Sequence, residues 1–230
     1  MIASPFDQHV LFHVGPVPVV TAVVTTWAIM IALVAGSWLA TKRLADRPSR
    51  TQAGLELVIE TIQNQIGDTI GSDPAPYLPL VGTLFLFLLT ANWTSLIPGL
   101  EAPTATIETD AALALIVLGA TIWFGVRGLG LIGYLRTFAR PSLFMAPLNM
   151  VELLTRSLSL TVRLFGNIMS GMFIIGIVLS LAGLLVPIPL MALEVLIGAV
   201  QAYIFAMLAT VFIAGALGDT SAPQNKEIST

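Results

Sequence analysis

PLNMVELLTRSLSLTVRLFGNIMSGMFIIGIVLSLA, residues 147–182, is a long apolar run whose only charged side chains are Glu152, Arg156 and Arg163. It begins at a proline and ends before a turn rich in glycine and proline, so it predicts one helix. An upright membrane crossing needs about 20 residues. This helix and the next, 189–217, are both longer, so we expect each to cross the membrane at a strong tilt.

The composition of the chain indicates an integral membrane protein. Of its 230 residues 56% are hydrophobic and 10% charged, and the mean hydropathy is +0.91. Soluble domains carry about 25% charged residues, so these charges are too few to cover a water-facing surface. The absence of cysteine excludes disulfides, thiolate metal sites and a cysteine nucleophile. His9 and His13 lack further ligands, so we interpret them as surface groups and predict no metal site.

The apolar runs predict an all-α fold in one membrane domain, 1–230, with five transmembrane helices and one membrane-surface helix. The predicted elements are an outer N-terminal segment (1–18), a first span (19–41), the surface helix (51–71), further spans at 77–97, 111–126, 147–182 and 189–217, and a C-terminal tail (218–230). The third span is short and stops at Arg127, before a stretch rich in glycine. The N-terminus lacks a basic region ahead of its apolar run, so we expect no cleaved signal.

The predicted surface helix is amphipathic. Its apolar residues recur at helical spacing on one face, at Leu55, Val58, Ile59, Ile62, Ile66 and Ile70. That pattern is typical of a helix that lies on the membrane or against a partner. A helix packed on a small soluble subdomain is the alternative.

Basic residues favour one side of the membrane. Lys and Arg residues occur just after the first span and within residues 127–140, whereas the loop 98–110 and the turn 183–189 contain none. The positive-inside rule therefore predicts five crossings, with the N-terminus outside and the C-terminus in the cytoplasm.

Nearly every strongly polar side chain of the 147–182 helix shares one face. At 100° per residue, these residues lie within about 40° of Arg163. They are Asn149, Glu152, Arg156, Ser159, Asn167 and Ser170, and we call this set with Arg163 the polar stripe. On the last helix Glu194, Gly198 and Gln201 also share a face, so a second polar surface can oppose the first.

Arg163 is the residue of this stripe whose placement in a membrane costs the most free energy. An arginine at membrane depth costs about 3 kcal/mol on insertion scales and more in simulations of an isolated helix. A buried ion pair with Glu152 or Glu194 that only holds two helices together is one interpretation, although such pairs seldom add stability. The other is a permanent positive charge beside an ion path, since arginine attracts a carboxylate but cannot relay its proton.

The motif SLTVRLFGN, residues 159–167, and the later segment QAYIF, residues 201–205, resemble the a subunit (subunit 6) of F-type rotary ATP synthases. The resemblance covers residues 77–217. It implies an ion-translocating stator subunit of the membrane Fo sector, which couples proton or sodium flow to rotation and to ATP synthesis or hydrolysis. The resemblance also implies that the subunit itself is not catalytic and binds no nucleotide, nucleic acid or cofactor.

The resemblance also implies roles for individual residues. Arg163 matches the arginine that faces each passing c-subunit carboxylate and separates two half-channels. Gln201 and Asn167 match polar residues beside it, and Glu194 matches a position in the outer half-channel. Asn149, Glu152 and Ser170 are expected to line the access paths, because they share the face of Arg163.

Three positions depart from the family pattern. Asn149 stands where many members have a glutamate, which Glu152 one turn away can supply. Met172 stands where many have glutamate or histidine, which leaves Glu194 as the titratable group of the outer path. Ser157 replaces a frequent proline.

The expected setting is a multi-pass subunit of the bacterial inner (plasma) membrane, surrounded by lipid. Its expected partners are the c-subunit ring, b-type stator subunits and, indirectly, the F1 headpiece. The compact N-terminal segment also resembles the shorter a subunits of the N-type, sodium-associated branch.

Two other classes of function fit the sequence less well. A secondary ion transporter with a buried Arg/Glu site is the main alternative, but no internal repeat is visible. An intramembrane enzyme is ranked last, because the spans contain no His or Cys and no GxSxG motif.

Overall fold

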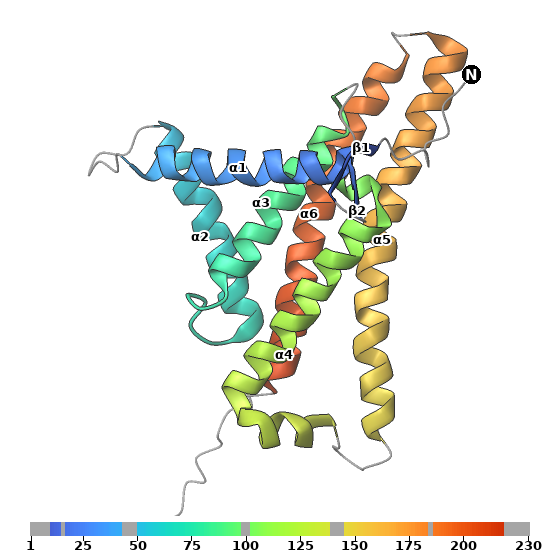
Figure 1. The fold of residues 1–230 in the computed structure, drawn as a ribbon. Coiled ribbons are helices and arrows are strands. Elements are labelled where there is room, and N and C mark those ends of the chain that lie inside the picture. The colour runs from blue at the N-terminus through green and yellow to red at the C-terminus, as the bar shows by residue number, and fades with distance from the viewer. Residues whose placement is uncertain are drawn as a thin grey trace, which may run out of the picture.

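The computed structural model describes residues 10–14, 17–42, 50–97, 102–138, 145–183 and 186–218 (Figure 1). Its elements are β1 (Val10–Val14), β2 (Val17–Val20), α1 (Thr21–Thr41), α2 (Arg50–Ile70), α3 (Leu78–Thr94), the short 3₁₀ helix η1 (Pro103–Ala105), α4 (Ile107–Phe138), α5 (Met145–Ala182) and α6 (Pro187–Leu217). The backbone of His13 lies in β1, whereas His9 and the predicted tail beyond Gly218 lie outside the described residues.

The protein is an all-α integral membrane protein. Among the described residues, four helices are long and apolar enough to cross a membrane, namely α1, α4, α5 and α6, and α3 is a shorter apolar helix. The exception to the all-helical architecture is a small antiparallel hairpin of β1 and β2. Our sequence reading missed it, although two valine-rich runs separated by Gly-Pro are a hairpin signal.

The helices do not run parallel to one another. Figure 1 shows α1 lying across the direction of α5 and α6. At 1.5 Å per residue, the 21 residues of α1 span about 31 Å, close to the hydrocarbon thickness, whereas the 38 residues of α5 span about 57 Å. In a membrane that α1 crosses upright, α5 and α6 are therefore strongly tilted.

The core lies where α3, α4, α5 and α6 meet. Its buried side chains are Leu84, Leu88, Leu113, Ala114, Val117, Leu160, Leu164, Ala202, Phe205 and Ala209. Three of these are alanines, and small residues let membrane helices approach closely. Helix α6 has the largest buried share of the four long apolar helices, so it is the central helix of the bundle.

Helix α2 joins this bundle through its second half. Ile66 is fully buried and packs with Val81 of α3 and Ala206 of α6, and the Tyr203 hydroxyl donates a 2.5 Å hydrogen bond to Gln65 Oε1. In the first half the apolar residues Leu55, Leu57, Val58 and Ile59 are exposed. The helix is thus attached to the membrane bundle, which argues against the alternative of a separate soluble subdomain.

The third predicted span, 111–126, was too short at both ends. Helix α4 begins at Ile107, passes through Arg127 and ends at Phe138. It is kinked at Gly130, whose φ of 73° suits only glycine, and Figure 1 shows its last part turning aside. The glycine-rich stretch resembled a loop, but only Gly130 leaves the helical conformation within α4.

Candidate functional site

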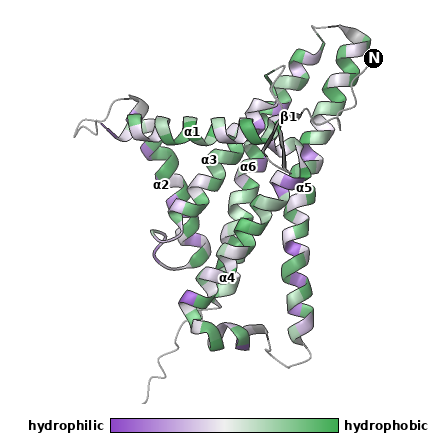
Figure 2. Ribbon diagram, viewed as in Figure 1, coloured by the Kyte–Doolittle hydropathy of each residue, from purple (hydrophilic) through white to green (hydrophobic). Residues whose placement is uncertain are grey.

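The polar stripe of α5 lies on the surface of the chain and not in its core. Glu152, Arg156, Ser159, Arg163 and Ser170 are exposed, and Asn149 and Asn167 are half-buried. Figure 2 shows hydrophilic positions recurring along the otherwise largely hydrophobic α5. Large apolar side chains beside the stripe are exposed as well, among them Leu158 and Val162 at more than 60%. The surface around Arg163 is therefore an apolar face with a charge at its centre.

Arg163 has no ion-pair partner within the described part of the chain. The salt bridge found there joins Arg156 to Glu152, and the Arg156 guanidinium also lies 5.3 Å from the centre of the Phe212 ring. Neither Glu152 nor Glu194 pairs with Arg163. This disfavours the interpretation of Arg163 as one half of a buried structural ion pair.

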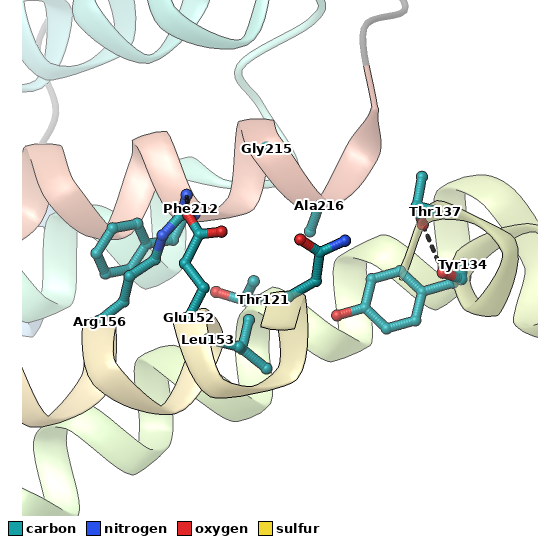
Figure 3. A pocket seen from close by; sticks show the side chains of 10 residues that line it. Thr121, Tyr134, Thr137, Glu152, Leu153, Arg156, Phe212, Gly215 and Ala216 are labelled. Atoms are coloured by element: carbon teal, nitrogen blue, oxygen red, sulfur yellow. Dashed lines mark hydrogen bonds and ion pairs between the residues drawn. The ribbon is translucent and has the colours of Figure 1, made fainter. Parts of the chain in front are cut away.

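A cavity of about 230 Å³ lies at one end of the stripe, between α4, α5 and α6. We call it the Glu152 cavity; it is lined by Thr121, Tyr134, Thr137, Asn149, Glu152, Leu153, Arg156, Phe212, Gly215 and Ala216. In Figure 3 Glu152 and Arg156 extend from α5 toward α6, and Tyr134 enters from α4. At about 30 Å³ per water molecule, the cavity has room for about seven waters.

An open surface groove extends this cavity toward Arg163. It has a volume of about 500 Å³ and is lined by Leu148, Val151, Glu152, Thr155, Arg156 and Ser159. Glu152 and Arg156 line both spaces. Ser159 is the last lining residue on this side, and it lies one helical turn before Arg163.

A second cavity, of about 110 Å³, lies on the other side of Arg163, between α5 and α6. We call it the Glu194 cavity; it is lined by Asn167, Ser170, Gly171, Ile174, Ile175, Leu190, Leu193, Glu194 and Ile197. Asn167 lies one turn after Arg163, so the lined spaces end one turn away on each side of the arginine. Glu194 is the titratable group among these lining residues, and Met172 is not one of them.

Gly171 makes room for the Glu194 carboxylate. A Cβ atom placed on Gly171 would clash with both carboxylate oxygens of Glu194. The half-buried Glu194 side chain therefore lies directly against the backbone of α5, and a larger residue at position 171 would displace it.

Gln201 lies inside the bundle, between the two cavities along α6. It is 7% exposed, and its Nε2 has no hydrogen-bond partner in the described structure; the same holds for Asn167 Nδ2. Gly198 lies one turn before Gln201 on α6, and its carbonyl accepts a 2.9 Å hydrogen bond from Asn92 Nδ2 of α3. This bond links α6 to α3. The Asn92 Oδ1 accepts a 3.1 Å hydrogen bond from the Thr104 hydroxyl of η1.

The predicted residues therefore separate into three groups. Asn149 and Glu152 meet at one cavity, Asn167, Ser170 and Glu194 meet at the other, and Arg163 and Gln201 lie between them. Sequence reasoning did not assign Thr121, Tyr134 or Phe212 to the site, because a wall built by three helices depends on their packing. Arg156 was placed on the stripe, but its partner was missed, although Glu152 and Arg156 are four residues apart and so face each other on a helix.

Comparison with known proteins identifies the relatives of this chain. The family model described as ATP synthase A chain matches residues 23–214. "ATP synthase subunit a 2" of Bradyrhizobium sp. (strain BTAi1) is 56% identical over 96% of this chain and 99% of its own length. "ATP synthase subunit a 1" of Chlorobaculum parvum is 47% identical over 91% of this chain and 94% of its own length. "ATP synthase subunit a" of Moorella thermoacetica is 42% identical over 89% of this chain and 94% of its own length.

Proposed function

Since the chain belongs to the ATP synthase A chain family and is a non-catalytic membrane subunit of an F-type ATP synthase, we propose that it supplies two half-channels that load and unload the carboxylates of a rotating c-subunit ring. Arg163 separates the two paths. Ion flow through them is coupled to rotation and to ATP synthesis or hydrolysis in the headpiece.

One observation carries this proposal: Arg163 is exposed and unpaired within the described chain, and lined spaces end one turn away on each side of it. A charge on the membrane-facing surface of a helix is stable only if something outside the chain compensates it. A carboxylate on a neighbouring subunit is the natural partner, because arginine binds carboxylates with its planar guanidinium. The exposed apolar residues around Arg163 suit a partner that is itself apolar, as a ring of membrane helices is.

The two cavities receive different roles in this proposal. The Glu194 cavity is the outer half-channel, and the Glu152 cavity with its groove is the inner one. The ion enters past Glu194, binds a ring carboxylate, travels with the ring and leaves along Ser159, Arg156 and Glu152. Arg163 favours the ionised form of the carboxylate as it passes and repels cations that would leak between the paths. Gln201 and Asn167 hold water beside the arginine.

The proposed orientation follows the distribution of basic residues. The N-terminus lies outside and the C-terminus in the cytoplasm of a bacterial inner membrane. The b-type stator subunits hold the chain beside the ring and connect it to the F1 headpiece. Whether the ion is a proton or sodium depends on the ring carboxylates, and each charge that crosses contributes about 2.3 kcal/mol per 100 mV.

Single cysteines test the two paths, since the chain contains no native cysteine. In the assembled complex in vesicles, we expect a membrane-impermeant thiol reagent to label Asn149→Cys only from the headpiece side. We expect Ser170→Cys to be labelled only from the opposite side. Labelling is read by mass spectrometry after reagent is added to one side at a time.

Ala209→Cys is the matched control, because Ala209 is fully buried in the core and should be labelled from neither side. Labelling of both cavity cysteines from the same side would contradict two separate half-channels. Labelling of each from the side opposite to the expected one would keep the half-channels and reverse the proposed orientation.

A further inference from the structure

Asp110 is a buried carboxylate that the proposed mechanism does not use. Its side chain is 0% exposed, and neither carboxylate oxygen has a hydrogen-bond partner in the described structure. A buried ionised carboxylate without partners costs several kcal/mol, so such a group exchanges its charge for a proton or is hydrated by enclosed water. A residue kept at that cost calls for a function.

Asp110 lies on the face of α4 that points into the helix bundle. Leu113, Ala114, Val117 and Thr121 follow it at the spacing of one helix face, and all are buried. Leu115, Ile116 and Trp123 on other faces are more than 50% exposed. The Asp110 carboxylate is therefore directed toward the neighbouring helices.

The packing of α4 on α6 places Asp110 level with Gln201. Figure 1 shows the two helices running in the same direction. Gly125 lies against Ala216, since a Cβ on Gly125 would be 3.2 Å from the Ala216 Cβ. Thr121 and Phe212 both line the Glu152 cavity, which agrees with this offset between the helices. Counting back by this offset brings Asp110 to the level of Gln201.

The packing of α4 on α5 leads to the same layer. These helices run in opposite directions (Figure 1), and Thr121 shares the Glu152 cavity with Glu152 and Leu153. Counting back along α4 and forward along α5 brings Asp110 to the turn that contains Leu164. That turn is flanked by Arg163 and Asn167. The α4–α6 contact and the shared lining of the Glu152 cavity therefore both indicate that Asp110 lies in the layer of the bundle that contains Arg163 and Gln201.

The unpartnered atoms in this layer are complementary. Asp110 offers two acceptor oxygens, and Asn167 Nδ2 and Gln201 Nε2 are donors without a hydrogen-bond partner in the described structure. No direct hydrogen bond joins these groups in the described structure, and we expect water to bridge them. Asn167 also lines the Glu194 cavity, so bridging water would connect Asp110 to that cavity.

From this layer, and resting on the function proposed above, we propose that Asp110 is a proton-exchanging residue of the outer half-channel, between the Glu194 cavity and Arg163. Water held by the Asn167 and Gln201 amides delivers a proton to one Asp110 oxygen, and Asp110 returns it to water on the ring side.

The charged groups around Asp110 are few. Helix α3 and η1 contain none, α5 contributes Arg163, and α6 contributes Glu194, about two turns from Gln201. On α4 itself Glu108 is exposed.

The test is Asp110→Asn in the complete ATP synthase in vesicles, with ATP synthesis driven by an imposed gradient. The pH on the side of the Glu194 cavity is varied at fixed sodium and fixed pH on the other side. We expect the maximal rate to fall at least about tenfold, as for other lost proton-transfer groups, and the pH profile on that side to shift. A merely structural role would lower the rate or the yield without moving the profile. Asp110→Glu should recover part of the rate, because it restores a titratable group.

Glu108→Gln is the matched control, since it removes an exposed carboxylate from the same turn of α4 and should leave the profile in place. Should Asp110→Asn fail to assemble, Asp110→Thr decides the question in the same assay. An unmoved profile, or a loss that sodium reverses and pH does not, would overturn the proton-exchange role. The half-channel proposal would still stand if Arg163→Ala abolished coupling while Asp110→Asn had no effect, so the two can fail separately.

Discussion

Replacing Arg163 with alanine should reduce ATP-driven ion uptake to background in vesicles that contain the assembled complex. The side chain lies unpaired within the described chain, between the groove that extends the Glu152 cavity and the Glu194 cavity. A positive charge about 4 Å from a carboxylate contributes about 4 kcal/mol at an effective dielectric constant of 20. That energy is nearly a thousandfold preference for the ionised form, which the alanine variant loses. ATP hydrolysis should continue without ion transport. Ion uptake is measured with a pH- or sodium-sensitive dye.

The same variant should also raise passive ion leak through complexes stripped of the headpiece, because the barrier between the two paths is removed. Arg163→Lys keeps the charge but loses the planar guanidinium, so it should restore the block on leak better than it restores coupled uptake. Arg156→Ala is the matched comparison on the same face of α5, where the arginine is already paired with Glu152. Because Arg156 also lines the groove, we expect coupled uptake to fall in part but not to background. Wild-type uptake by Arg163→Ala would refute the role of Arg163 as divider.

The long helices could be predicted from the sequence because nothing interrupts them. The last two predicted helices, 147–182 and 189–217, differ from α5 and α6 by two residues at their starts. Both are apolar over far more than a membrane thickness, and both end at glycine or proline. The face of the polar stripe followed from helical periodicity alone. Its exposure did not, because the neighbours of a helix face depend on how the other helices pack.

Helix α4 could not be predicted in full, because its sequence contains conflicting signals. Arg127 and three nearby glycines are typical of a loop, yet only Gly130 leaves the helix. At the other end Asp110 lay in an acidic segment that we interpreted as an outer loop. The repeat of Asp110, Ala114, Val117 and Thr121 on one face was the available signal, and it places a carboxylate on the buried face. Charged residues rarely occupy core positions, so the sequence pattern argued against a buried Asp110. Exceptions of this kind concentrate at functional sites.

Glu194→Gln is expected to have the second largest effect, because Glu194 is the titratable group among the residues that line its cavity. Glutamine keeps the size of the side chain and removes its ability to exchange a proton or balance a cation. We expect ion flux at least about tenfold lower, with a weaker dependence on pH or sodium on the side of the cavity. The measurement is gradient-driven ATP synthesis in vesicles over a series of pH and sodium values. An unchanged profile would remove Glu194 from the path.

Gly171→Ala separates the position of the carboxylate from its chemistry. The added methyl group would overlap the Glu194 carboxylate and move it away from α5, while the charge remains. We therefore expect flux to fall less than in Glu194→Gln, and the dependence on pH or sodium to persist. Gly176→Ala is the matched control, since a Cβ there meets nothing within 4 Å. If Gly171→Ala behaved like Gly176→Ala, the contact of Glu194 with α5 would be irrelevant to transport. If Gly171→Ala and Glu194→Gln lost flux equally, the placement of the carboxylate would matter as much as its charge.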